Sequence, residues 1–165
     1  MIFKHILLHG LGYGFIVTAY LLIMMMTINP RVWGYSDYSE AIKAKIAPQS
    51  KREKRLALFV GIPWMIFTFG FPIYSTYFLK ASLGGVIPFW LAFVNIFFLV
   101  FLATAGDLVI LDWLIVSKIT PRFVIIEGTE EADYKDFSHH FRGHARAVPA
   151  LLGVCILFAG IVFFF

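Results

Sequence analysis

Two aspartates, Asp107 and Asp112, interrupt a long apolar stretch at residues 86–116. A carboxylate inside hydrocarbon is energetically costly, so an intramembrane Asp is a functional candidate by default. Their i, i+5 spacing puts them about 140° apart around an α-helix, which does not predict a paired dyad. Alternatively, the hydrocarbon ends near Gly106, both aspartates lie at or beyond the interface, and Trp113 anchors the helix among the headgroups.

Histidines gather further along the chain, where His139 to His144 read His-His-Phe-Arg-Gly-His. If this segment is helical, His140 and His144 lie one turn apart on one face, a spacing that suits two metal ligands. Asp136 stands one turn before His140 on the same stripe. The pattern predicts a divalent metal site, and imidazole with carboxylate suits zinc, iron or manganese. The alternative is a polar helix face in the headgroup layer.

The segment between these regions is acidic. Glu127 follows a short apolar run at residues 123–126, which predicts a strand or a loop held against the membrane face. The functional hypothesis is that Glu127 joins Asp107, Asp112 and the histidines in one polar pocket. That pocket would bind a metal ion or take up protons or cations. The alternative is a solvated loop.

Composition excludes several classes of function. The chain has 165 residues, of which 60% are hydrophobic and only 15% charged, too apolar for a soluble domain of this size. The lone Cys155 excludes an internal disulfide and a cysteine zinc site. No phosphate-binding loop, nucleophile elbow or nucleic-acid motif occurs, so the net charge of +4 is attributed to membrane orientation rather than to nucleic acid.

Four apolar stretches are long enough to span a bilayer, which takes roughly 20 helical residues. We therefore predict an all-α integral membrane protein, 1–165 as one domain, forming an antiparallel four-helix bundle with short interfacial segments. Gly10 and Gly14 permit close packing of the first helix. Pro149 marks either the first turn of the last span or a kink in a longer helix. The predicted spans cover about 6–28, 56–79, 86–110 and 149–165.

The basic residues predict the orientation. Segments 29–55 and 107–148 hold twelve of the 14 Lys and Arg residues, and only Lys4 and Lys80 lie elsewhere. Because Lys and Arg concentrate in cytoplasmic loops, we expect the loops at about 29–55 and 113–148 inside a cell membrane and both termini outside. The basic residues at 51–55 should attract anionic lipid headgroups.

Smaller motifs mark two helix starts and a second histidine pair. Ser50 with Glu53, and Asp37 with Glu40, fit capping boxes. His5 and His9 are also one helical turn apart. The predicted orientation places this pair across the membrane from the other histidines, where an interfacial role is expected.

These features leave three functions open. The first is solute or ion binding or transport through the polar cytoplasmic-facing site, with Asp107 as the main candidate. For this first function we expect a homo-oligomer. The second is a non-catalytic subunit of a membrane complex. The third is a metal-dependent membrane enzyme that acts on a lipid-like substrate.

Overall fold

A computed structural model describes all 165 residues, and it is entirely helical apart from turns and loops. The all-α prediction is confirmed, with four helical stretches long and apolar enough to cross a membrane. Three of these are α1, α4 and α6, and the other is α5 continued by η1. The elements in chain order are α1 (Ile2–Thr27), α2 (Pro30–Trp33), α3 (Glu40–Lys45), α4 (Lys51–Ser82), α5 (Phe89–Gly106), η1 (Asp107–Ile119), η2 (Glu131–Tyr134) and α6 (Phe137–Phe164).

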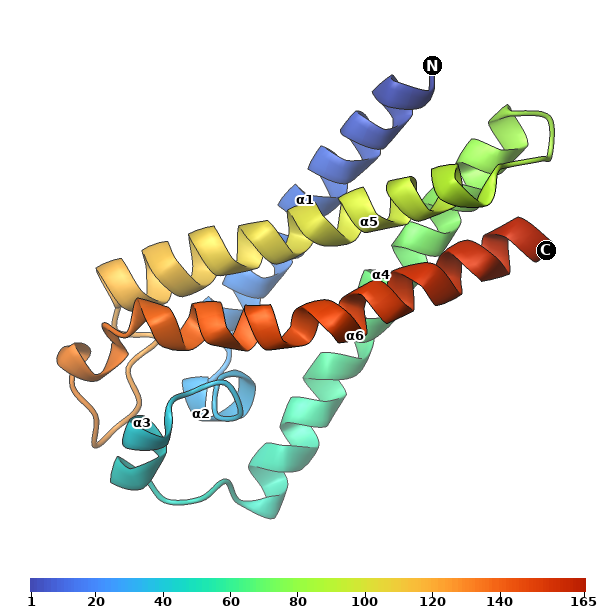
Figure 1. Cartoon of the computed structure of the whole chain (residues 1–165). Helices are drawn as coiled ribbons and strands as arrows, with labels where there is room; N and C mark the ends of the chain where they lie inside the picture. The colour runs from blue at the N-terminus through green and yellow to red at the C-terminus, as the bar shows by residue number, and fades with distance from the viewer.

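The long helices run antiparallel, so both chain termini lie at one end of the molecule (Figure 1). We call this the terminus end. The connections that contain α2, α3 and η2 lie at the opposite end, which we call the loop end (Figure 1). Helix α5 lies between α1 and α6 and packs along both, whereas the first half of α4 diverges from α5 and α6 toward the loop end (Figure 1). This divergence opens the space in which the candidate site lies.

Two of the helices extend beyond the apolar spans. Helix α6 begins at Phe137, so Pro149 lies inside a longer helix and not in the first turn of the last span. Its start is fixed by Asp136, whose side chain accepts a hydrogen bond from the His139 N–H. The third helix continues as η1 to Ile119. The loop expected at about 113–148 is therefore non-helical mainly over residues 120–136, because interfacial helix can continue where the apolar run has ended.

The local helix signals had mixed outcomes. The capping box of Ser50 and Glu53 is confirmed at the start of α4. The box of Asp37 and Glu40 is wrong, since α3 is capped by Ser39, whose hydroxyl accepts a hydrogen bond from the Ile42 N–H. Residues 123–126 form a loop rather than a strand.

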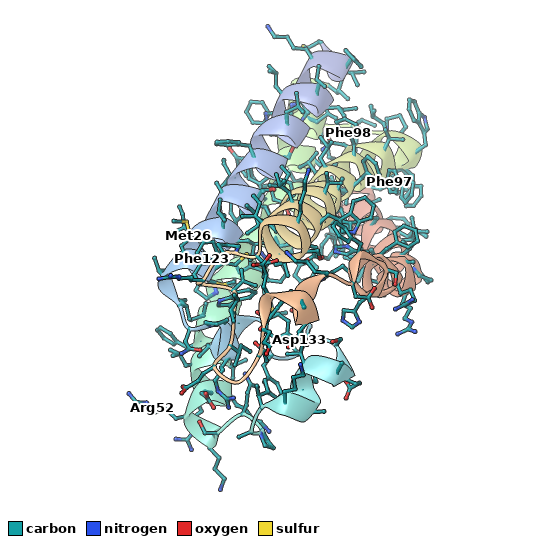
Figure 2. All side chains as sticks on the ribbon, turned by 90° about the vertical axis from the view of Figure 1, so that its left-hand side faces the viewer. Met26, Arg52, Phe97, Phe98, Phe123 and Asp133 are labelled. Carbon is teal, nitrogen blue, oxygen red and sulfur yellow. The ribbon has the colours of Figure 1, made fainter.

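The loop end has a small core of its own. Val124 and Ile126 are fully buried there, and the Tyr38 hydroxyl donates a hydrogen bond to the Val124 carbonyl at 3.1 Å. An ion pair of 2.6 Å between Lys45 and Asp133 joins α3 to η2, and Asp133 is labelled in Figure 2. Met25 of α1 and Leu111 and Val116 of η1 belong to the same core, which holds the connecting segments against the ends of these helices.

Glycines allow the closest helix contact. A Cβ at Gly10 would lie 2.8 Å from the Phe98 ring, and one at Gly14 would lie 3.3 Å from Leu102 Cβ. The expected role of this glycine pair is confirmed, because α1 approaches α5 more closely than larger residues would permit. This contact fixes α1 against α5 and leaves α4 as the element with more space around it.

Candidate metal centre

The candidate metal centre depends on the type of helix that η1 forms. Residues Asp107–Ile119 form a π-helix, in which each N–H bonds to the carbonyl five residues earlier. Residues i and i+5 then share a face instead of lying about 140° apart. Asp107 and Asp112 are thereby brought together, which the α-helical expectation did not predict. The segment ends where the Thr120 N–H bonds to the Ile115 carbonyl and Thr120 adopts a positive φ of 47°.

Helix α6 supplies two imidazoles opposite this face. His144 Nε2 lies 3.0 Å from Asp112 Oδ2 and 3.7 Å from Asp107 Oδ2. His140 Nδ1 lies 3.3 Å from the other carboxylate oxygen of Asp112. Asp112 is thus held between two histidines one turn apart on α6, and its side chain is 21% exposed.

These separations suit a bound metal ion. Ligand atoms roughly 2.1 Å from a tetrahedral zinc lie roughly 3.4 Å from one another. Ligand atoms of Asp107, Asp112 and His144 all lie within 4.8 Å of one another. His140 would hold the second oxygen of Asp112, as residues behind a metal ligand commonly do. A divalent cation would also neutralise two carboxylates that otherwise repel each other in a partly buried site.

A cavity of about 650 Å³ adjoins these side chains. Its far wall is the first half of α4, where Ala57, Gly61 and Trp64 line it, and Gly143 and Ala147 line it on α6. No atom of another residue lies within 4 Å of where a Cβ would stand at Gly61 or Gly143. At these positions the two helices present small residues to the space between them, and that space is the cavity.

No family model, curated protein or solved structure matches this chain.

The structure brings together four of the sequence candidates and leaves two apart. Asp107, Asp112, His140 and His144 line the cavity, whereas Glu127 and Asp136 do not. Glu127 is exposed on the loop. Asp136 is exposed too, since it caps α6 and its carboxylate lies 3.5 Å from the Arg142 guanidinium. The stripe of Asp136, His140 and His144 fails as one ligand set because the residue that caps a helix lies outside its regular turn.

Sequence reasoning missed two groups that face the cavity. The Trp64 indole N–H is buried without a hydrogen-bond partner, so it is available to a ligand. Asp37 also lines the cavity, and its backbone carbonyl accepts from His139 Nε2 at 2.8 Å. Although Asp37 as a whole is exposed, desolvation of its carboxyl group raises its pKa; the Ser36 hydroxyl opposes this, and the charge of Asp112 adds to it. No spacing in the sequence indicated that either residue would face the cavity.

Proposed function

We propose that this protein is an integral membrane protein that binds a divalent transition metal through Asp107, Asp112 and His144. The observation that carries the proposal is the meeting of two carboxylates from η1 with an imidazole from α6 inside a cavity. Imidazole nitrogen with carboxylate oxygen is a donor set for zinc, iron or manganese. A bound ion of this kind acts as a Lewis acid on an oxygen of a second ligand.

The size of the cavity supports an amphiphilic second ligand. A volume of about 650 Å³ is far more than an ion and its waters occupy, and 12 of its 22 lining residues are hydrophobic. The polar groups gather on η1 and α6, while the α4 wall offers apolar side chains and one free indole N–H. A molecule with an oxygen-bearing head and an apolar chain satisfies both parts, as a lipid-like substrate of a metal-dependent membrane enzyme would.

The proposed setting follows from the distribution of charge. Loop-end segments carry twelve of the 14 Lys and Arg residues, which supports a cytoplasmic loop end and external termini in a cell membrane. At the start of α4, Arg52 extends away from the helices (Figure 2), and with Lys51, Lys54 and Arg55 it forms an exposed basic group suited to anionic headgroups. The metal site would then face the cytoplasmic leaflet.

Transport of the bound ion is the second candidate. Polar side chains on α1 and α4 extend from the cavity toward the terminus end. This observation supports transport as the alternative to a reaction on a lipid-like substrate. Membership of a larger membrane complex and self-association both remain predictions.

Metal titration tests the proposal. We expect chelator-treated protein in detergent to bind zinc or manganese with a stoichiometry of about one per chain, measured by calorimetry. Binding should weaken as the pH falls, because protons compete for imidazole and carboxylate ligands. Titration heats that match those of buffer for zinc, iron and manganese alike would refute the proposal.

A further inference from the structure

A second polar cluster lies toward the terminus end, between α1 and α4. His5 Nε2 is 3.1 Å from the Ser75 carbonyl oxygen and 3.2 Å from Ser75 Oγ. His9 Nδ1 is 2.9 Å from the same Oγ. Since a carbonyl oxygen only accepts hydrogen bonds, His5 Nε2 carries a hydrogen. The two imidazoles, whose ring centroids are 3.8 Å apart, therefore contact the same hydroxyl.

Asn95 fixes the direction of these hydrogen bonds. Its Nδ2 donates to Thr76 Oγ1 at 2.9 Å and to Ser75 Oγ at 3.4 Å, and the side chain is fully buried. Ser75 Oγ thus accepts from His5 and from Asn95, and its own O–H is left to donate to His9 Nδ1. The result is a directed chain from His5 through Ser75 to His9.

The next polar pair toward the loop end is Tyr13 with Thr68. Pro72 has no N–H, so the Thr68 carbonyl four residues earlier lacks its helical partner. The Tyr13 hydroxyl donates to that carbonyl at 2.8 Å. His5, His9 and Tyr13 are spaced by four residues, so they line one face of α1 against α4.

Two unsatisfied buried atoms continue the series. Thr68 Oγ1 and Trp64 Nε1 both lack hydrogen-bond partners, and they lie one turn apart on α4. Buried polar atoms without protein partners are places where ordered water binds. Trp64 lines the cavity, so this part of the series opens into the candidate metal site.

One aromatic side chain separates the two halves of this series. The Phe71 ring stacks on Tyr13 with centroids 5.2 Å apart, and its centroid is 6.1 Å from that of His9. Apolar constrictions of this kind close polar pathways by excluding water. Displacement of Phe71 would let water join His9 to Tyr13.

We propose that this series is a proton pathway through the membrane between the terminus end and the cavity. In the first step, protonated His5 gives its Nε2 proton to Ser75 Oγ while the Ser75 O–H proton passes to His9 Nδ1. His5 ends neutral, His9 ends as the cation, and Ser75 is unchanged. Water beside Phe71, Thr68 and Trp64 then accepts the proton from His9 Nε2 and carries it to the cavity. The pathway stands independently of metal binding.

Proton flux into liposomes tests this pathway. The protein is reconstituted with a pH-sensitive dye inside, a potassium diffusion potential is applied, and flux is recorded with and without external manganese. We expect Ser75→Ala to slow the flux by at least about tenfold, because the hydroxyl relay is lost, whereas Ser75→Thr keeps the hydroxyl and most of the flux. His9→Gln should act as Ser75→Ala does.

The controls separate loss of the relay from loss of the fold. Ser82→Ala removes a hydroxyl whose hydrogen bond to the Leu79 carbonyl is local to α4, so its flux should match that of the wild type. Each variant should also keep the zinc binding of the loop end. Wild-type flux equal to that of protein-free liposomes under both conditions would overturn the pathway. So would full flux in Ser75→Ala.

Discussion

Asp112→Asn is expected to weaken divalent metal binding by about 100-fold or more, since replacing even the residues behind a ligand costs about 10- to 100-fold. Asp112 contributes both carboxylate oxygens, one facing His144 at 3.0 Å and the other facing His140 at 3.3 Å. The amide keeps the shape of the side chain but removes its charge, so the remaining negative charge of Asp107 no longer balances a divalent ion. The measurement is a zinc or manganese titration of chelator-treated protein.

Glu127→Gln is the matched control for this substitution. Glu127 is an exposed carboxylate near the same end of the molecule and lies outside the cavity. Its neutralisation should leave metal affinity within about threefold of wild type, given the small free-energy contribution of surface charges. Equal affinity in Asp112→Asn and Glu127→Gln would place the metal elsewhere. A preserved thermal transition in both variants would show that the comparison concerns binding and not folding.

Gly61→Phe is expected to reduce occupancy of the cavity by an amphiphile at least about tenfold, equivalent to a loss of about 1.4 kcal/mol in binding. Nothing lies within 4 Å of the position a Cβ would take at Gly61, and Gly61 lines the cavity, so the benzyl group of a phenylalanine there is expected to occupy cavity space. The probe is a photoreactive long-chain fatty acid, added to the protein in lipid nanodiscs. Crosslinks to the α4 and α6 walls, mapped by mass spectrometry, report occupancy.

Gly70→Phe provides the comparison on the same helix. Gly70 also has nothing within 4 Å of its Cβ position, but it is exposed and does not line the cavity. Crosslinking at the cavity should therefore persist in this variant. Zinc affinity should persist in both, because neither glycine touches the carboxylates. Undiminished cavity crosslinks in Gly61→Phe would contradict an amphiphile in this space while leaving the metal site untouched.

Hydropathy and charge alone predicted the fold class well. The four apolar stretches predicted four long helices, and the long connecting segments share one end of the molecule, as an antiparallel bundle requires. The ends of the helices were predicted less well. Helix α6 reaches back to Phe137 because Asp136 caps it there, and hydropathy carries no information about a helix that continues into the interface.

The site was predicted in its residue types and missed in its geometry. Asp107, Asp112, His140 and His144 all stood out by charge or spacing. Their meeting depends on the π-helix of η1, and a change from i+4 to i+5 hydrogen bonding leaves no periodic pattern in an apolar sequence. No sequence pattern indicated Trp64. Only tertiary packing shows that its indole N–H is buried without a hydrogen-bond partner.

Elemental analysis of the purified wild-type protein tests the central claim most directly. The protein should be prepared without a histidine tag or a metal column, so that any divalent ion comes from the cell. The arrangement of Asp107, Asp112 and His144 predicts about one zinc, iron or manganese ion per chain, and its absence from Asp112→Asn prepared in parallel. Divalent metal at background level in the wild type, even after the protein is offered all three ions, would contradict a metal centre at the loop end.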